Sequence, residues 1–388
     1  MVNISDSPLN YSPFIITEKT KTMSELFYRI ALTKVPKVGA IHSKNLIAHC
    51  GSAEAVFKTS RAHLTKINGI GEGIADYILT SNVLKWAEKE LDFIEKNKVR
   101  VLYHTDAAYP RRLCANADCP MLLYYKGTAD LNAPRIVSIV GTRKPSSYGI
   151  RMCEEIIDGF LPHNVLIISG LAYGIDAAAH RRCLSARMPT VGIMGTGLQR
   201  IYPEEHRSFG LKMCENGGLL TEYPSDQDPE QKHFPMRNRI IAGMSDAVIV
   251  VETAAKGGSM ITANIALDYG RDVFAVPGRV GDPYAQGCND LLRKRKASLI
   301  EQANNVAEQL RWTDLDAGKP PAQTQLFLEL SDNEHFILGI LKKSETPIPI
   351  DALSLEAKMN PSQIASLLLN LEFKGVVQAF PGKRFGLV

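Results

Sequence analysis

Residues 135–160 read RIVSIVGTRKPSSYGIRMCEEIIDGF, an apolar run followed by a glycine turn and a helical pattern. The apolar run is short and rich in β-branched residues, with Ser138 as its one polar member, which is typical of a parallel strand covered on both faces. The chain passes from this strand through Gly141 directly into a helix. The stretch therefore predicts one unit of a doubly wound α/β sheet.

Four further stretches contain such a strand, and three of them also continue through a Gly-rich turn into a helix. They read VLIISGLAYGIDAAAHRRCL, TVGIMGTGLQRIYPEEH, AVIVVETAAKGGSMITANIALDYG and DVFAVPG. Ligands of doubly wound sheets collect at the carboxyl ends of the strands, where helix N-termini offer free N–H groups to anions. The turns at Gly141, Gly170, Gly195 and Gly257 are therefore expected to line one crevice of a Rossmann-like parallel sheet.

Basic residues crowd the segment that precedes one of these strands, HFPMRNRIIAGMSDAVIVVET at residues 233–253. Pro235 suits the first position of a helix, which predicts a helix from about Met236 to Met244 with Arg237, Asn238 and Arg239 in its first turns. Arginine at that end opposes the helix dipole, whose positive end already lies there. Positive charge added to a positive end suggests an external anion.

The cluster GTRKP adds Arg143 and Lys144 to the first glycine turn of the sheet. Free N–H groups beside a guanidinium suit a phosphodiester, because arginine can bind two phosphate oxygens at once. A structural ion pair of Arg143 is the alternative. GTGLQR matches the dinucleotide fingerprint only weakly, and the chain has no P-loop motif.

Flanking segments predict two smaller domains. Near the N-terminus, VPKVGAIHSKNLI and INGIGEGIADYI resemble paired helix-hairpin-helix motifs, in which Gly69, Gly71 and Gly73 could meet a phosphate; a purely structural helical module is the alternative. Near the C-terminus, three helical patterns and a hairpin suggest a winged helix. The predicted organisation is a flexible N-terminus (1–23), a helical helix-hairpin-helix or SAM-like domain with connector (24–133), a Rossmann-like domain (134–312), a linker (313–325) and a winged-helix domain (326–388).

Composition limits the class of protein. The net charge of +4 is small, no apolar run is long enough to span a membrane, and seven scattered cysteines lack a C-x-x-C pair. These features predict a cytoplasmic protein with reduced thiols, no membrane partner and neither metal nor cofactor. Residues 325–388 carry six basic and seven acidic side chains, so the winged-helix domain is expected to contact protein or to bind duplex only weakly.

Six ordered blocks strongly resemble the DNA processing protein A (DprA/Smf) family: SIVGTRKPSSYG, SGLAYGIDAAAH, GTGLQRIYPEEH, HFPMRNRIIAGMSDAVIVVE, KGGSMITANIALDYGRDVFAVPG and GCNDLL. The resemblance implies a non-enzymatic protein that binds single-stranded DNA in natural transformation, forms homodimers through the α/β domain and loads a RecA-type recombinase. It places the DNA pocket on Arg143, Lys232, Phe234, Arg237, Asn238 and the turn Gly257, Gly258, Ser259. The glycine turns and basic clusters add Gly141, Lys144, Gly170 and Arg239 to the DNA-binding residues.

Phe234, between Lys232 and Arg237, is interpreted as a stacking face for unpaired bases, with a role in core packing as the alternative. Near IYPEEH, Glu204 and Glu205 stand where some relatives carry a basic residue, so the resemblance does not place DNA along that side.

Two other functions remain open from the sequence. A nucleotide-processing enzyme of the phosphoribohydrolase type could use Asp176 and His180, which lie four residues apart on one helix, with Glu222 or Glu252 as contacts to ribose or bases. Asn264 stands where the catalytic Glu of such enzymes is expected, which argues against hydrolysis. A winged-helix transcription regulator is the second alternative, although the third helix of the predicted domain offers Ser362, Gln363 and Ser366 but no arginine.

Overall fold

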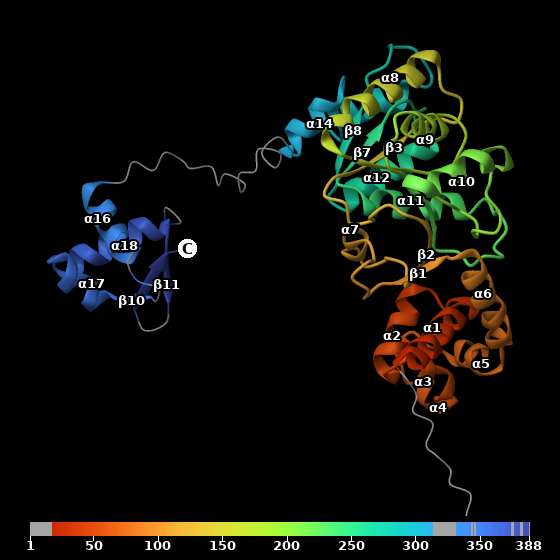
Figure 1. Cartoon of the computed structure of the whole chain (residues 1–388), viewed down its shortest axis with the longest axis horizontal. Coiled ribbons are helices and arrows are strands. Elements are labelled where there is room, and N and C mark those ends of the chain that lie inside the picture. Colours follow the sequence, from red (N-terminus) through yellow and green to blue (C-terminus); the bar gives the residue numbers. More distant parts are fainter. Residues whose placement is uncertain are drawn as a thin grey trace, which may run out of the picture. The chain divides into compact units, whose positions relative to one another are not determined.

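The computed structural model describes residues 18–312, 331–342, 344, 347–373, 376–380 and 383–387. Contacts divide the chain into two units, Met1–Trp312 and Thr313–Val388 (Figure 1). The predicted flexible N-terminus lies outside the described residues except for 18–23, which belong to the first helix. The predicted linker 313–325 lies entirely outside them.

A single sheet of nine strands runs through the described part of the first unit, in the order β1-β2-β6-β5-β4-β3-β7-β8-β9. All neighbouring strands in the series β6-β5-β4-β3-β7-β8-β9 pair in parallel. Strands β1 and β2 add an antiparallel edge next to β6. The bounds are β1 Arg100–Tyr103, β2 Leu122–Gly127, β3 Ile136–Val140, β4 Leu166–Ser169, β5 Thr190–Ile193, β6 Gly218–Thr221, β7 Ala247–Val250, β8 Asp272–Ala275 and β9 Ser298–Leu299.

The doubly wound α/β sheet predicted from the sequence is confirmed. The five predicted strands are β3, β4, β5, β7 and β8, and their central residues are fully buried. Four other strands, β1, β2, β6 and β9, were not predicted. From β3 the strand order proceeds outward through β4, β5 and β6, and then reverses to β7 on the other side of β3. The loops that follow β3 and β7 therefore separate and open a crevice at the carboxyl edge.

Helices cover both faces of the sheet. One apolar core contains side chains of α8 (Ser147–Gly159), α9 (Ile175–Ser185) and α14 (Ala303–Gln309). The other contains side chains of α7 (Arg111–Cys114), α11 (His233–Met244), α12 (Gly258–Asp268) and α13 (Gln286–Arg293). Helix α10 (Arg207–Asn216) packs with a smaller cluster around Leu171 and Leu219. Two short 3₁₀ turns, η1 (Leu161–His163) and η2 (Glu204–His206), lie in the connections of the sheet.

The N-terminal helices pack against the antiparallel edge of the sheet. They are α1 Glu18–Lys34, α2 Ala40–Cys50, α3 Ala53–Lys58, α4 Arg61–Leu64, α5 Glu72–Thr80 and α6 Val83–Asn97 (Figure 1). Leu46 and Ile78 share one core with Tyr103 and Tyr124 of strands β1 and β2. In the second predicted hairpin, Gly69 has a φ of 85°, a left-handed conformation that favours glycine.

A buried carboxylate joins these helices to the loop between β6 and α11. Glu90 of α6 is 2% exposed and accepts hydrogen bonds from the backbone N–H of Ser225 at 2.8 Å and from its hydroxyl at 2.6 Å. Burial raises the pKa of Glu90. On the same loop, Asp226 accepts from Trp86 Nε1 at 2.9 Å. The helical module therefore fixes the segment that leads into α11.

The second unit has the predicted winged-helix plan. Helices α16 (Asp332–Leu341), α17 (Ile350–Ala357) and α18 (Pro361–Phe373) pack around Ile337, Leu353 and Leu368. Within the described residues of this unit, strands β10 (Ile348–Pro349), β12 (Arg384–Leu387) and β11 (Val377–Phe380) form a sheet in that order.

Two negative findings apply to the described part of the chain. No helix in it is long and apolar enough to cross a membrane. No group of three or more His, Cys, Asp or Glu side chains in it could hold a metal ion.

We expect Glu90→Ala to lower the free energy of unfolding by about 1–3 kcal/mol, because two buried donors of Ser225 lose their acceptor. Glu90→Gln retains one carbonyl acceptor and should lose less. Urea denaturation measures both, and Glu88→Ala on the exposed face of the same helix is the matched control, with an expected change within about 0.5 kcal/mol. Equal stability of the Glu90→Ala and Glu88→Ala proteins would contradict a role for this contact.

Candidate functional site

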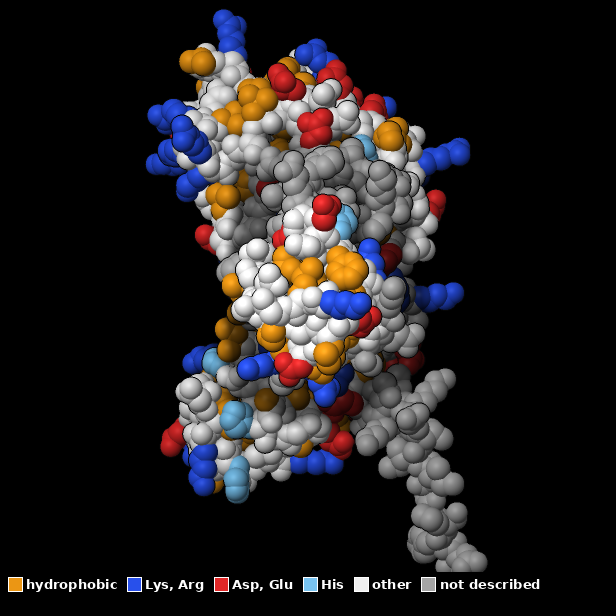
Figure 2. Space-filling view, turned by 90° about the vertical axis from the view of Figure 1, so that its left-hand side faces the viewer, with side chains coloured by type: hydrophobic (Ala, Val, Ile, Leu, Met, Phe, Trp, Pro, Cys, Tyr) orange, Lys and Arg blue, Asp and Glu red, His pale blue; other side chains and the backbone are white. Residues whose placement is uncertain are grey.

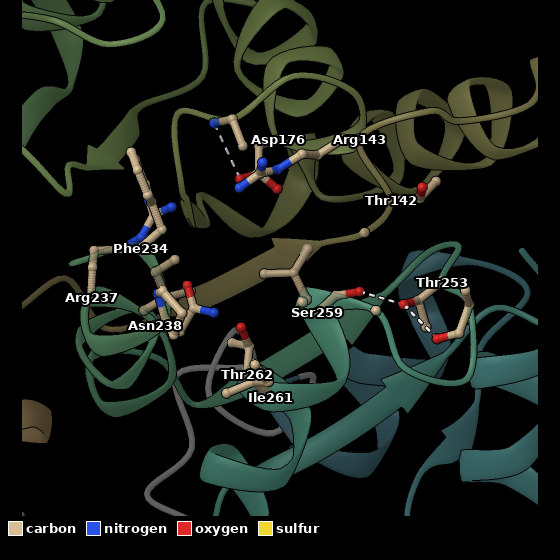
Figure 3. A pocket seen from close by; sticks show the side chains of 18 of the residues that line it. Thr142, Arg143, Asp176, Phe234, Arg237, Asn238, Thr253, Ser259, Ile261 and Thr262 are labelled. Carbon is tan, nitrogen blue, oxygen red and sulfur yellow. Dashed lines mark hydrogen bonds between the residues drawn. The ribbon is translucent and has the colours of Figure 1, made fainter. Parts of the chain in front are cut away.

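A cavity of about 570 Å³ lies at the carboxyl edge of the sheet, where the strand order reverses. The loops after β3 and β7 and the first turns of α11 and α12 surround it, as Figure 3 shows. Of the residues predicted to bind DNA, eight line this cavity: Gly141, Arg143, Phe234, Arg237, Asn238, Gly257, Gly258 and Ser259.

The start of α12 presents backbone donors to the cavity. Gly257 is the N-cap of this helix and makes no side-chain cap, so the first N–H groups keep their hydrogen-bonding capacity. A Cβ atom at Gly257 would overlap Thr253 Oγ1, whereas one at Gly258 would meet nothing within 4 Å. Ser259 donates its hydroxyl to Thr253 Oγ1 at 2.7 Å, which fixes the turn. This arrangement suits an anion.

Arg237 lies at the floor of the cavity and is only 4% exposed. Its Nη1 donates to the carbonyl oxygen of Ile193 at the end of β5, while its Nε has no partner in the described residues. Gly170 lies directly beneath, because a Cβ atom there would overlap both the Arg237 guanidinium and the Asp176 carboxylate. Burial lowers the pKa of Arg237, and the nearby charge of Asp176 opposes this effect.

Asp176 places an acid among these cations. It is 7% exposed, lines the cavity and accepts from the N–H of Ala172 at 3.4 Å. Burial raises the pKa of Asp176 to about 6, against the lowering effect of the Arg237 and Arg143 charges. The cavity therefore holds a buried carboxyl group with a raised pKa close to the charges of Arg237 and Arg143; Figure 3 shows the three side chains.

Arg143 is the exposed cation of the cavity. The described residues give it no ion-pair partner, so the alternative of a structural ion pair has no support. Its backbone is fixed by Gly174, which has a φ of 83° and where a Cβ atom would overlap the Thr142 carbonyl oxygen. Arg143 is thus held on a rigid turn with its guanidinium available to an anion.

Two aromatic rings border the same space. Phe234 is half-buried, lies outside the apolar cores and lines both the main cavity and a small adjoining cavity of about 50 Å³. The ring of Tyr202, which is 46% exposed, lies 5.6 Å from that of Phe234 between centroids, at 42°. A Cβ atom at Gly195 would lie 3.0 Å from the Phe234 ring, so the predicted glycine turn supports this aromatic.

Four of the predicted binding residues do not line either cavity. Lys144 is exposed on the turn, Gly170 lies below the floor, and Lys232 pairs with Glu230 at 2.7 Å. Arg239 pairs with Glu222 and donates to the carbonyl oxygen of Asp118 at 3.0 Å. The helix that carries Arg237 also begins at His233, three residues before the predicted start. Lining residues that the sequence did not indicate include Thr142, Tyr202, Gln231, Thr262 and Tyr284.

The groups considered for an enzyme are placed differently. His180 is fully buried, with Nδ1 2.8 Å from Thr190 Oγ1 and Nε2 2.5 Å from the Gly170 carbonyl oxygen. Burial lowers the pKa of His180 to about 4, so it is neutral and separated from the cavity. Asn264 donates to the Met260 carbonyl oxygen, and Glu252 accepts from the N–H of Ser146. Asp176 therefore has no histidine partner in the cavity for acid–base work.

Comparisons with known proteins agree with this architecture. Residues 100–311 match the family model of the DNA recombination-mediator protein A, and residues 319–383 match the DprA winged helix domain. Protein Smf of Synechocystis sp. is 31% identical over 392 residues, covering 93% of this chain and 98% of that protein.

Two of the similar solved structures are of DprA proteins. The X-ray structure of DprA from Streptococcus pneumoniae has a TM-score of 0.59 at 30% identity and covers 73% of this chain and 96% of that one. DprA from Helicobacter pylori, solved to study its single-stranded DNA binding mode, has a TM-score of 0.50 at 29% identity and covers 55% and 96%.

The fold and the matches place the chain in a class of proteins that combine a Rossmann-like recombination-mediator-type domain with a winged helix. The chain belongs to the DNA processing protein A (DprA/Smf) family, which confirms the resemblance in its sequence blocks.

We expect Arg237→Ala to lower the free energy of unfolding by about 3–5 kcal/mol, because a buried carboxylate loses its nearest charge compensation. Arg237→Ala combined with Asp176→Asn should recover part of the loss, which a double-mutant cycle in urea quantifies. Arg143→Ala serves as the control, since its side chain is exposed and its loss should change stability by less than about 0.5 kcal/mol. If Arg237→Ala and Arg143→Ala have the same free energy of unfolding, Arg237 does not stabilise the floor of the cavity.

Proposed function

We propose that the cavity binds single-stranded DNA without reading its sequence. The observation that carries this proposal is the combination, in one cavity, of the free N–H groups of α12, the exposed Arg143 and the paired rings of Phe234 and Tyr202. Phosphates bind the first two, and unpaired bases stack on aromatic faces in a sequence-tolerant way. The single-stranded DNA binding mode described for the Helicobacter pylori relative supports the same ligand.

The cellular role proposed with it is DNA processing in natural transformation: protecting incoming single strands in the cytoplasm and loading a RecA-type recombinase onto them. Two observations support this role: relatives of this chain are named DNA processing proteins, and the family model that it matches is that of a DNA recombination mediator. We further propose that the protein acts as a homodimer through its α/β domain and is not an enzyme. The burial of His180 away from the cavity supports the last point.

For the winged helix we propose protein contact or weak duplex binding. The exposed face of α18 carries Ser362, Gln363 and Ser366, none of them cationic, and Leu369 is 52% exposed. DNA-groove helices normally supply Arg or Lys to phosphates and bases, so this face is poorly suited to tight duplex binding.

A titration of fluorescent oligo-dT tests the proposed function. We expect Phe234→Ala to weaken binding by about 1–3 kcal/mol with an unchanged salt slope, because a stacked base is lost and no charge is removed. Arg143→Ala should instead make the slope of log affinity against log salt shallower by about 0.7, the value for one phosphate contact. Asn264→Ala, outside the cavity, is the control. Undiminished binding by both cavity variants, or release of free base from nucleotides at an enzymatic rate, would refute the proposal.

The buried carboxyl makes DNA affinity depend on pH. An adjacent phosphate favours the neutral form of Asp176, so its pKa in the complex rises above the value of about 6 in the free protein. Binding then takes up a proton, and affinity should rise as pH falls from the higher of these pKa values toward 6. Asp176→Asn should bind more tightly at pH 8 and show a flatter profile between pH 8 and 6. A variant with the pH profile of the wild type would exclude Asp176 as the titrating group.

A further inference from the structure

Two exposed tyrosine rings border the small cavity that adjoins the candidate DNA cavity. On the face drawn in Figure 2, hydrophobic side chains reach the surface only in small separate groups among charged and polar ones. Tyr173 and Tyr202 are 43% and 46% exposed, and both line the small cavity beside Phe234. The apolar clusters formed by the described residues include neither tyrosine. Core packing therefore does not account for two large rings at this place.

The backbone around Tyr173 is fixed to the wall of the candidate DNA cavity. On one side, the N–H of Ala172 donates to the Asp176 carboxylate at 3.4 Å. On the other side, a Cβ atom at Gly174 would overlap the carbonyl oxygen of Thr142. Ala172, Asp176 and Thr142 all line the main cavity. The turn that carries Tyr173 is therefore held in a constant position relative to the cavity.

The ring of Tyr173 is also held in one orientation. Its hydroxyl donates to Glu205 Oε2 at 2.7 Å, and its centroid lies 4.9 Å from that of the buried His206 ring, at an interplanar angle of 69°. The hydroxyl contact raises the pKa of Tyr173 and lowers the pKa of Glu205, so at neutral pH the hydroxyl donates to a carboxylate. A ring that is already oriented loses little conformational entropy when a ligand stacks on it.

The charges beside Tyr173 do not favour phosphates. Glu204 and Glu205 of η2 are both exposed, and the next residue after η2, Arg207, is an exposed cation. Two carboxylates and one cation leave no excess positive charge on this rim, which is why the sequence did not place DNA along it. Nucleobases are uncharged and stack on aromatic faces without a cation. The rim therefore suits the bases of a strand better than its phosphates.

We propose that Tyr173 is a base-stacking position for single-stranded DNA that leaves the cavity over Tyr202, and that Glu205 positions its ring. The proposal rests on the proposed function of the cavity and adds a contact that depends on bases alone. The bases face the rings, and the phosphates face solvent, away from Glu204 and Glu205. Bases that are paired in a duplex do not expose a face to such a ring, so this position adds to the preference for single strands.

The test compares three strands of six units that carry the same phosphates. They are dT6, a strand of three thymidines followed by three abasic units, and a strand with these halves in reverse order. The thymidines occupy the cavity, and the abasic half reaches the rim without bases. Each strand is titrated on the wild type, Tyr173→Ala and Tyr173→Phe. Tyr77→Ala is the matched control, because Tyr77 of α5 is 38% exposed and lines neither cavity.

We expect the wild type to bind dT6 roughly 5- to 150-fold more tightly than one of the two abasic strands, the ratio that corresponds to about 1–3 kcal/mol for a stacked base. In Tyr173→Ala this ratio should shrink at least about fivefold, while the salt slope for dT6 stays unchanged because no charge is removed. Tyr173→Phe keeps the ring and should keep most of the ratio. Tyr77→Ala should give the ratio of the wild type.

The positioning role of Glu205 is tested with a charge-matched pair of variants. Glu205→Ala removes the acceptor of the Tyr173 hydroxyl, whereas Glu204→Ala removes an equal charge from a side chain that makes no hydrogen bond within the described residues. The ratio between dT6 and the abasic strand should fall about two- to tenfold in Glu205→Ala, the loss expected for one hydrogen bond. It should stay unchanged in Glu204→Ala. Glu205→Gln, whose amide oxygen accepts the same bond, should keep most of the ratio.

Three outcomes would overturn the proposal, and a fourth concerns the cavity alone. A wild-type ratio in Tyr173→Ala would exclude Tyr173 as a stacking position. Equal weakening of dT6 and of both abasic strands in that variant would show a changed cavity and not the loss of one stacked base. Equal ratios in Glu205→Ala and Glu204→Ala would remove the positioning role. The proposed function of the cavity fails separately, if Phe234→Ala binds every strand as the wild type does.

Discussion

A guanidinium buried between three elements sets the geometry of the cavity. Arg237 of α11 donates to the carbonyl oxygen of Ile193 at the end of β5 and faces Asp176 of α9, above a glycine that leaves no room for a side chain. Removing such a charge from water costs several kcal/mol, which only close compensation offsets. Because this contact fixes the first turns of α11, it also fixes Phe234 and Asn238 on the same helix. The side chains that line the cavity therefore depend on a buried contact beneath them.

The same helix shows why a sequence does not reveal whether an arginine pairs with an acid of the protein or with an external anion. Arg237 and Arg239 both lie where the dipole of α11 is unfavourable, which suggested an external anion. In the structure each is met by an acid from another element, Asp176 or Glu222. Those acids are about 60 and 17 residues away along the chain, so local patterns do not reveal the pairing. The cation left for a ligand is Arg143, which lies on a different loop.

The parts of the structure that the sequence predicted are those that depend on local residue patterns, and the parts it missed depend on contacts between distant segments. Strands with continuous β-branched runs, β3, β4, β5, β7 and β8, are recognisable because burial on both faces demands that composition. Strand β9 has only two residues, and β6, which reads GLLT, contains no β-branched apolar residue. Strands β1 and β2 depend on pairing with distant partners. In the site, glycine turns and family motifs indicated most of the cavity. Tyr202 was missed because its place beside Phe234 depends on how a loop meets helix α11, about 30 residues further along the chain.

A carboxyl group opposes binding in a cavity that is proposed to receive phosphates, yet it would serve two physical purposes there. It reduces repulsion between Arg143 and Arg237, which lets both approach the same space. In the proposed function it would also keep the intrinsic affinity of the cavity for DNA moderate, so that tight binding of a long strand would depend on several separate contacts. Contacts of this kind reinforce one another while all are made, and each is released individually at little cost. A protein proposed to pass its strand to a recombinase requires both properties.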